Sequence, residues 1–332
     1  MRIGKVKESI LKRSVLRQLH NHSEQGSPAS GEDAGVLFMS EFMPGFSEDA
    51  GVAVAVNPVE GWTFAAKRAV YGAVNSMLAA GASLKAISLS ILMPEETEEK
   101  QLKALMKEID SLCTQENIFV LSGHTAVSPY VSTLILSVTA MGSVAGEKKS
   151  ITAAVLGADF DLVVAGTVGR EGAAMLATEY AKRLEERYAP SYIEAAKHLF
   201  DDGSMTVIAD ILQEKEVISV HDVREGGIFA ALWEMAAAAN VGLSIDLRNV
   251  PIKQHTIEVC EYFNLNPYML RSGGTLLLAC TNGARIVEQL KNAGVEAAVI
   301  GQTTAGNDRL IRYDDEARFL EPPKMDEYYK VH

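Results

Sequence analysis

The sequence predicts a two-domain α+β protein, and three observations support this prediction. The chain has 332 residues, of which 48% are hydrophobic, so it is long enough to bury more than one core. Short valine-rich runs typical of strands alternate with long apolar stripes at the 3.6-residue spacing of helices. A polar, lysine-containing stretch, 142–152, is the candidate linker. We therefore expect an N-terminal domain over residues 1–145 and a C-terminal domain over residues 146–332.

The first domain is expected to combine a sheet with two amphipathic helices. Residues 62–80 place apolar side chains on one stripe that ends at Gly81, which predicts a helix closed by glycine. The order strand-strand-helix-strand-helix-strand-strand is typical of an α+β unit with both helices on one side of the sheet. Residues 1–20 predict a further short helix. The expected strands are 35–39, 52–56, 84–93, 118–121 and 131–142, and the second main helix is 95–117.

The second domain is expected to be an α/β unit that begins with a strand at 160–165. Its helices are expected near 171–186, 191–200, 205–213, 226–240, 253–263 and 283–293, and its other strands at 217–220, 242–246, 275–280 and 297–303. Turns that contain glycine lie between several of these elements, and they hold many of the candidate site residues.

Charge, hydropathy and cysteine spacing narrow the function classes. A net charge of −12 disfavours nucleic-acid binding, because phosphate backbones are bound by clustered lysines and arginines. No apolar run reaches the roughly 18–20 residues of a membrane span, and the first residues lack the apolar core of a signal peptide, so we expect a cytoplasmic protein. Cys113, Cys260 and Cys280 lack the spacing of a metal site or a redox pair and are expected to be buried free thiols.

The turn from His221 to Gly227 lies between a predicted strand and a predicted helix, and it has two interpretations. In the structural one, Asp222 is the helix N-cap and Glu225 completes a capping box. In the functional one, the backbone N–H groups of Gly226 and Gly227 bind a phosphate at the helix N-terminus, where the lack of a side chain allows close approach. The sequence alone leaves both open.

Other turns also carry a structural and a functional interpretation. Glu32 and Asp33 precede a strand, where they form either a solvated turn or ligands for a divalent metal. His124 follows a predicted strand, and a lone histidine in such a turn is usually only hydrogen-bonded. The turn at 272–274 is either a simple turn or an anion nest, and the turn at 166–172 has the wrong glycine spacing for a dinucleotide site.

The order of these motifs is more specific than any one of them. Together they resemble the superfamily of aminoimidazole ribonucleotide (AIR) synthetase, the PurM-like fold, which includes selenophosphate synthetase, thiamine-monophosphate kinase and the hydrogenase maturation factor HypE. The pieces Leu232-Trp233-Glu234, Asn266-Pro267-Tyr268 and Asp326 to Val331 resemble the HypE-like, AIR synthase-related proteins of anaerobic bacteria. The resemblance runs from about Gly4 to Lys330.

This resemblance implies a fold, a cofactor and a set of partners. Members have an N-terminal α+β domain whose strands form a barrel with those of a second copy, followed by a C-terminal α/β domain. They bind ATP near the dimer interface, use Mg²⁺, and transfer phosphate to activate an oxygen for displacement. The implied roles are metal binding for Glu32 and Asp33, nucleotide or substrate binding for Asn75, His124, Thr125, Gly226 and Gly227, and catalysis for His221 and Asp222.

The chain departs from the superfamily pattern at acidic positions. Relatives have an aspartate where this chain has Asn57, and another where it has Ser76 after Asn75. Mg²⁺ prefers carboxylate oxygens, so the resemblance implies a weakened metal site and impaired phosphoryl transfer. HypE itself also uses a C-terminal cysteine as carbamoyl acceptor, whereas this sequence ends Lys330-Val331-His332, so cyanide-ligand synthesis on this chain is not expected.

Three functions are compatible with these features. The first is ATP-dependent, ligase- or kinase-like activation of a small substrate by a homodimer. The second is a catalytically silent nucleotide- or metabolite-binding protein, which could partner an active paralogue. AIR synthetase proper ranks last, because that enzyme carries a Gly-Glu-Thr turn and a different glycine-rich turn in place of 221–227. The substrate, the nucleotide preference and the pathway do not follow from the sequence.

Overall fold

The computed structural model describes residues 6, 8–19, 32–38, 50–144, 156–314 and 316–331. The chain forms two compact units. The N-terminal unit contains residues 33–150 and 203–206, and the C-terminal unit contains residues 1–32, 151–202 and 207–332. Compared with the expected ranges, the described residues among the first 32 group with the C-terminal unit, and the short segment 203–206 groups with the N-terminal unit.

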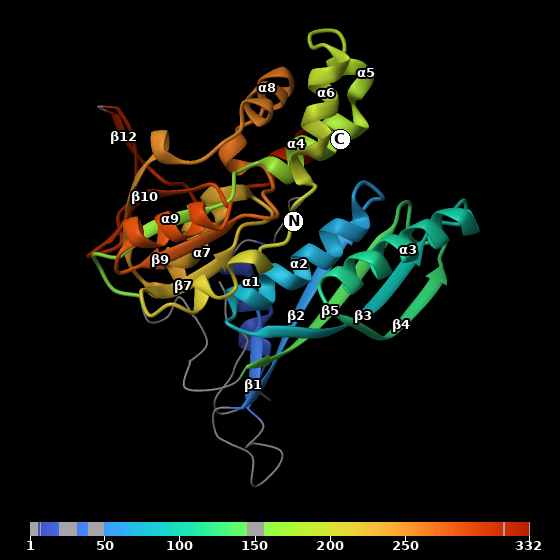
Figure 1. The fold of residues 1–332 in the computed structure, drawn as a ribbon, viewed down its shortest axis with the longest axis horizontal. Helices are drawn as coiled ribbons and strands as arrows, with labels where there is room; N and C mark the ends of the chain where they lie inside the picture. The colour runs from blue at the N-terminus through green and yellow to red at the C-terminus, as the bar shows by residue number, and fades with distance from the viewer. Residues whose placement is uncertain are drawn as a thin grey trace. The chain divides into compact units, whose positions relative to one another are not determined.

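The N-terminal unit is a five-stranded sheet with two helices on one face, as the order of elements predicted (Figure 1). The strand order is β1-β2-β5-β3-β4, with β3 and β4 parallel and all other neighbours antiparallel. The elements are β1 (Gly35–Phe38), β2 (Gly51–Glu60), α2 (Ala65–Ala79), β3 (Ser83–Met93), α3 (Glu99–Gln115), β4 (Phe119–Val127) and β5 (Ile135–Val144).

Side-chain periodicity explains how these elements pack. In α3 the buried side chains are Leu105, Ile109, Leu112 and Cys113, which share one helical face. The backbone N–H of Glu98 donates to Gln101 Oε1 (2.9 Å), which completes a capping box at the start of α3. Gly81, with φ +69°, follows α2 and confirms the predicted glycine end.

The strand that carries His124 is longer than the sequence indicated. The expected turn at 122–125 is wrong, because β4 shifts register once at Leu121 and then pairs with β3 from Ser122 to Val127. Hydroxyl Oγ atoms of Ser88 and Ser122 lie 2.9 Å apart across the two strands. A Cβ atom at Gly123 would come within 2.6 Å of the Leu89 carbonyl oxygen, so this glycine permits close strand pairing rather than a turn.

The edges of this sheet also differ from expectation. The valine-rich strands expected near 52–56 and 131–142 are not edge strands, because β2 and β5 pair with each other from Gly51–Val144 to Glu60–Ile135 in the interior of the sheet. The edge strands are β1 and β4. Phe119 and Leu121 of β4 are 67% and 65% exposed, so apolar surface does lie at an edge, although on a different strand.

The C-terminal unit is built on a seven-stranded sheet with the order β12-β11-β8-β10-β6-β9-β7. Only β8 and β11 pair in parallel. Its strands are β6 (Asp161–Ala165), β7 (Val217–Asp222), β8 (Gly242–Asp246), β9 (Leu276–Cys280), β10 (Ala297–Thr304), β11 (Arg309–Tyr313) and β12 (Glu316–Phe319). Its α-helices are α1 (Glu8–Ser14), α4 (Arg170–Glu179), α5 (Ala181–Leu184), α6 (Pro190–Lys197), α7 (Gly227–Ala239), α8 (Gln254–Phe263) and α9 (Gly283–Asn292). Short 3-10 turns include η5 (Thr206–Ile208), η6 (Ile211–Gln213), η8 (Pro267–Met269) and η9 (Glu327–Lys330).

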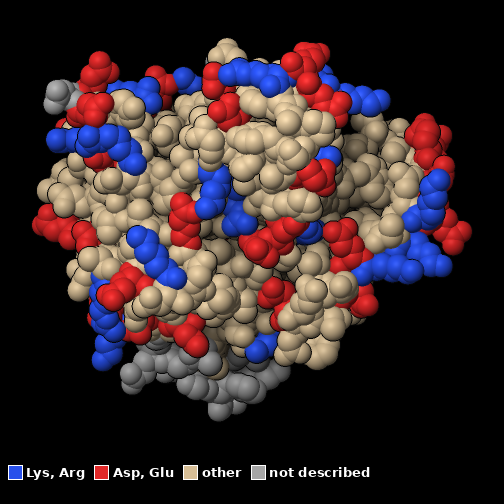
Figure 2. Space-filling model, turned by 45° about the horizontal axis from the view of Figure 1, so that its top comes forward, with Lys and Arg blue, Asp and Glu red and all other residues tan. Residues whose placement is uncertain are grey.

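The core of this unit lies between α7 and the sheet. Ile228 and Leu232 of α7 pack in one cluster with Leu162, Leu277 and Ile300 from three strands. The helix expected at 205–213 is replaced by η5 and η6, and β11 and β12 were not predicted. Among the described residues, no helix has the length and apolar content that a bilayer crossing requires. On the face shown in Figure 2, basic and acidic side chains are interspersed.

Candidate functional site

Three glycine turns that the sequence analysis treated separately meet at one end of the seven-stranded sheet. The C-termini of β6 and β7 and the N-terminus of β9 lie together there, since Ala165 and Asp222 both pair with Leu276. The turns themselves are hydrogen-bonded to each other. The Gly169 N–H donates to Ser272 Oγ (2.7 Å), and the Ser272 N–H donates to the Arg224 carbonyl (3.3 Å).

The glycines of these turns allow backbone segments to touch. Gly166 has φ +97°, and a Cβ there would lie 2.6 Å from the Gly274 carbonyl oxygen. Gly227 has φ +64°, and a Cβ there would lie 2.6 Å from the Tyr268 carbonyl oxygen. The Gly227 N–H itself donates to the Arg224 carbonyl (3.0 Å). These positions therefore need glycine for backbone packing, whether or not a ligand is present.

The N-terminus of α7 is capped by the other end of the chain. Gly226, with φ +83°, is the N-cap residue, whereas Asp222 is the last residue of β7, so the capping-box interpretation of Asp222 and Glu225 is wrong. The Gly226 N–H, which we expected to receive a phosphate, donates to Asp326 Oδ2 at 2.6 Å. A carboxylate of the chain thus occupies the position at which the helix favours an anion.

Asp326 is enclosed by donors and by one cation. Its side chain is 1% exposed, the Tyr328 N–H donates to Oδ1 (2.9 Å), and Arg271 Nε lies 3.9 Å from Oδ1. Burial raises the pKa of the Asp326 carboxyl to about 6, and this effect outweighs Arg271 and the two backbone N–H groups, which lower it. Asp326 was not among the predicted site residues, although the segment Asp326 to Val331 carries part of the family resemblance.

The segment that carries Asp326 is held by several further contacts. The Arg271 guanidinium lies over the rings of Tyr328 and Tyr329, 4.6 and 5.1 Å from their centroids. The Tyr328 hydroxyl donates to Glu179 on α4 (2.9 Å), so the end of the chain lies beside this helix, as Figure 1 also shows. The Asn266 N–H donates to Glu327 Oε2 (3.0 Å).

His221 and Asp222 are both buried, at 6% and 4% exposure, at the end of β7. His221 Nε2 lies 3.0 Å from Glu234 Oε2 on α7, and Asp222 Oδ2 lies 3.9 Å from Arg224 Nε. A histidine held by a carboxylate has a fixed ring orientation and can exchange a proton through its ring nitrogens. Four of the expected site residues, the two glycines included, therefore lie in one turn region.

Glu171 is another acid in this region that the sequence analysis did not select. It lies in the first turn of α4 and is buried, and its Oε2 accepts a hydrogen bond from the Gly273 N–H (2.8 Å). Its charge also contributes to the raised pKa of Asp326. The Ser-Gly-Gly turn is therefore not an open anion nest, because a carboxylate of the chain already binds one of its N–H groups.

In the N-terminal unit, Asn75, which was expected to bind a nucleotide, forms hydrogen bonds to the backbone instead. Its Nδ2 donates to the Gly203 carbonyl (2.8 Å), and its Oδ1 accepts from the Met205 N–H (3.0 Å). The neighbouring Ser76 hydroxyl donates to Asn57 Oδ1 (3.3 Å), and both side chains are buried. Asn57 and Ser76, the positions at which the resemblance implies aspartates in relatives, thus form an uncharged, hydrogen-bonded pair.

The remaining expected site residues lie on strands or beside them. His124 and Thr125 are exposed on β4, and Glu32 and Asp33 are half-buried just before β1. Within the described ranges, no group of three or more His, Cys, Asp or Glu side chains is arranged to hold a metal ion. The carboxylate pair remains a predicted metal site.

The three cysteines are buried free thiols, which confirms the sequence prediction. Burial raises the pKa of Cys113 to about 11, and that of both Cys260 and Cys280 to about 12. A thiol acts as a nucleophile through its thiolate, so these side chains are unreactive near neutral pH.

Comparison with known proteins identifies the family. The model of the AIR synthase related protein N-terminal domain matches residues 31–144, and that of its C-terminal domain matches residues 161–313. A hydrogenase expression/formation protein of Methanocaldococcus jannaschii is 26% identical over 317 residues, which cover 93% of this chain and 90% of that protein.

Solved structures agree with this assignment at the level of the fold. HypE in a complex with HypF superposes with a TM-score of 0.76 at 18% identity, covering 95% of this chain and 100% of that chain. HypE in complex with ATP superposes with a TM-score of 0.71 at 16% identity, covering 98% and 97%. The chain therefore belongs to the AIR synthase related family and has the two-domain, PurM-like fold of HypE-like hydrogenase maturation proteins.

Proposed function

We propose that this protein binds ATP and uses it to activate a small substrate, with a weaker dependence on Mg²⁺ than its relatives. The observation that carries the proposal is that the family models match both domains of the chain, so neither domain of the family has been lost. HypE has been solved with ATP on the same two-domain fold.

The structure supports a division of the proposed roles. His124 and Thr125, on the exposed strand β4, have side chains available to contact a nucleotide. Asn75 would act indirectly, because both ends of its carboxamide hold the segment 203–205. It would position that segment rather than bind phosphate.

On the substrate side, we assign proton transfer to His221, oriented by Glu234, with Asp222 beside it. Gly226 and Gly227 shape the turn. A phosphate could reach the Gly226 N–H only after the Asp326 carboxylate leaves, because that carboxylate already accepts its hydrogen bond. In the described conformation, this amide is therefore a structural contact.

The side chains that could act as ligands fit a weakly bound metal ion. Glu32 and Asp33 supply the hard carboxylate oxygens that Mg²⁺ prefers, and we assign any metal binding to them. Asn57 and Ser76 are neutral and are hydrogen-bonded to each other, so they add no charge. Mg²⁺ would supply charge neutralisation of the ATP phosphates when bound.

The three cysteine thiols do not take part in the proposed chemistry, because all are buried and their pKa values are raised to about 11 or 12. We propose instead that the activated oxygen belongs to a free small molecule.

A second candidate function is a catalytically silent nucleotide- or metabolite-binding protein. The buried Asn57–Ser76 pair favours it, since phosphoryl transfer depends on neutralising phosphate charge. Incubating the protein with ATP, Mg²⁺ and candidate acids or amides and measuring ADP separates the two. ADP formation that requires His221 supports the enzyme, and ATP binding without ADP formation supports the silent protein.

We propose that the protein is a homodimer formed through the N-terminal unit. Edge strand β4 exposes Phe119 and Leu121, and such apolar edges are usually covered by another chain. Light scattering should give twice the chain mass, and Leu121→Lys should shift the protein toward monomer. A stable wild-type monomer at micromolar concentration would contradict the proposal.

A further inference from the structure

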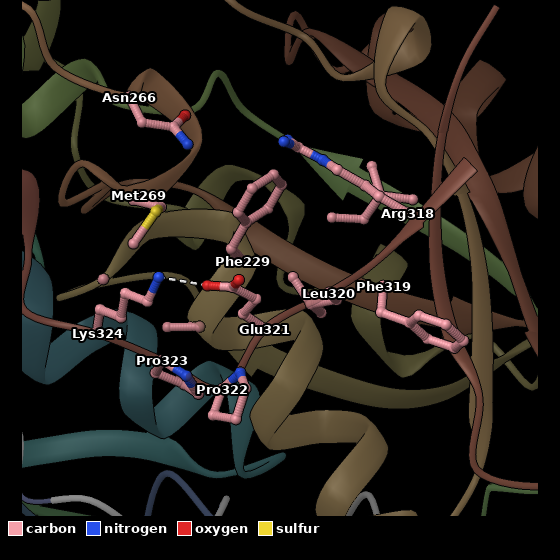
Figure 3. Close-up of a pocket in the computed structure, with 13 residues that line it drawn as sticks. Phe229, Asn266, Met269, Arg318, Phe319, Leu320, Glu321, Pro322, Pro323 and Lys324 are labelled. Carbon is pink, nitrogen blue, oxygen red and sulfur yellow. Dashed lines mark ion pairs between the residues drawn. The ribbon is translucent and has the colours of Figure 1, made fainter. Parts of the chain in front are cut away.

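A cavity of about 250 Å³ lies within the C-terminal unit. Of the site residues assigned above, Gly226 is the one that lines it, at its margin. It is bounded by α7, η8, β11 and the segment 318–324 (Figure 3). Its size suits a small organic molecule rather than a nucleotide, since most ligand pockets for larger compounds span about 300–1,000 Å³.

The floor of the cavity is apolar and partly aromatic. Phe229 lines it, and the Phe229 ring stacks on Tyr268 with centroids 5.4 Å apart and an interplanar angle of 11°. Tyr268 is not itself a lining residue, so it supports the ring from behind. The Met269 thioether and the buried side chains of Ile311 and Leu320 complete this floor. A flat apolar group fits such a surface, because aromatic faces and thioether sulfur both pack well against rings.

Two hydrogen-bond donors face this floor. Asn266 Oδ1 accepts from the Tyr268 N–H (3.1 Å), which leaves the carboxamide NH₂ as a donor, and Figure 3 shows it directed toward the lining residues. The Arg318 guanidinium lies beside the Phe229 ring in the same view. Arg318 also lines the cavity. The pKa of the Glu321 carboxyl is lowered mainly by Lys324 and also by the charge of Arg318, so this carboxylate lies near both cations. A guanidinium and an amide above an aromatic floor are suited to an anion with an apolar body.

The charge at the cavity indicates which anion fits. Lys324 and Glu321 form an ion pair at the rim, so their charges cancel and Arg318 contributes one net positive charge. A carboxylate carries one negative charge and matches the guanidinium fork in two parallel hydrogen bonds. A phosphate monoester carries about 1.5 to 2 negative charges, which one arginine does not balance beside a glutamate.

We propose that this cavity is a binding site for a small monocarboxylate with a flat apolar body, such as an aromatic acid. Arg318 and the Asn266 carboxamide hold the carboxylate, and Phe229 and Met269 hold the body. The site goes beyond the proposed ATP-dependent activity, because binding there needs neither ATP nor Mg²⁺.

The test uses three probes that share a phenyl ring in titration calorimetry: benzoate, its neutral isostere benzamide, and phenyl phosphate. The full chain should bind benzoate at least tenfold more tightly than benzamide, since a hydrogen-bonded charge is lost with the amide. Arg318→Gln should weaken benzoate binding about tenfold, while Arg312→Gln, which removes an exposed arginine on the neighbouring β11 outside the cavity, should leave it unchanged.

A further variant tests the charge count. Glu321→Gln should free Lys324 to act as a second cation and should strengthen phenyl phosphate binding more than benzoate binding. Circular dichroism and melting temperature establish that each variant is folded. Absence of benzoate binding at millimolar concentration, equal binding of benzamide, or equal weakening by Arg312→Gln would overturn the proposal.

Discussion

Replacing Asp326 by asparagine should remove a specific pH dependence of stability. In the wild type, the Asp326 carboxyl is buried among the Gly226 and Tyr328 N–H groups and Arg271, and its pKa is raised from 3.8 to about 6. The folded state therefore binds a proton more tightly than the unfolded chain. The stability that this proton contributes is complete below about pH 4 and is lost as the pH rises through about 6.

The size of the effect follows from the pKa values. A rise from 3.8 to about 6 is worth about 3 kcal/mol, because each pKa unit corresponds to about 1.4 kcal/mol. Other carboxylates also titrate in the lower part of the interval between pH 3.8 and about pH 6. Between pH 5 and pH 7.5, this one group should reduce the free energy of unfolding by about 1.4 kcal/mol. The Asp326→Asn variant has no proton to lose and should not show this part of the decrease.

Urea unfolding at several pH values, followed by Trp233 fluorescence, measures this difference. Trp233 lies on α7 in the same unit as Asp326, and Trp62→Phe removes the other tryptophan from the signal. Subtracting the unfolding free energy of the variant from that of the parent cancels all other titrations. Asn292→Ala, at an exposed position of the same unit, is the control and should give a constant difference, because neither side chain titrates. A difference for Asp326→Asn that does not change between pH 5 and pH 7.5 would refute the reasoning.

Two further predictions concern folding contacts. Asn75→Ala should destabilise the N-terminal unit by about 2–5 kcal/mol, because it leaves the buried Gly203 carbonyl and Met205 N–H without their partner. Hydrogen exchange of this variant should show early opening at 203–206, and unchanged exchange there would contradict the prediction. In thermal unfolding, Gly227→Ala should lose several kcal/mol more stability than Gly294→Ala. Both glycines have positive φ, but only a Cβ at Gly227 would collide with backbone. Equal losses of stability would show that the backbone moves aside.

Much of the fold could be predicted because its elements have regular periodicity. The helix at 62–80 and the strand at 84–93 correspond to α2 and β3, whose apolar residues repeat at 3.6 and at 2 positions. The helix expected at 205–213 failed because its backbone is held elsewhere: the Met205 N–H bonds to Asn75, 130 positions away. Strands β11 and β12 carry exposed charged residues and lack the apolar alternation that identifies a strand.

The site could be predicted only in part, since motifs show local chemistry but not distant partners. The sequence selected the 221–227 turn, and the structure brings it together with the turns at 166–172 and 271–274. It did not indicate that the Gly226 N–H binds Asp326, because that contact joins residues 100 positions apart. Nor did it show that Asn57 and Ser76 form a hydrogen-bonded pair.

The most direct test of the proposed function is titration calorimetry with ATP, with and without Mg²⁺, on the wild type and on the double variant Asn57→Asp, Ser76→Asp. We expect the wild type to bind ATP with an affinity that Mg²⁺ changes little, because the Asn57–Ser76 pair carries no charge. The double variant should bind Mg²⁺–ATP more tightly than the wild type, and Arg312→Gln, which alters a charge in the other unit, should not. Wild-type protein that binds no ATP under either condition would contradict the proposal of a nucleotide-binding protein.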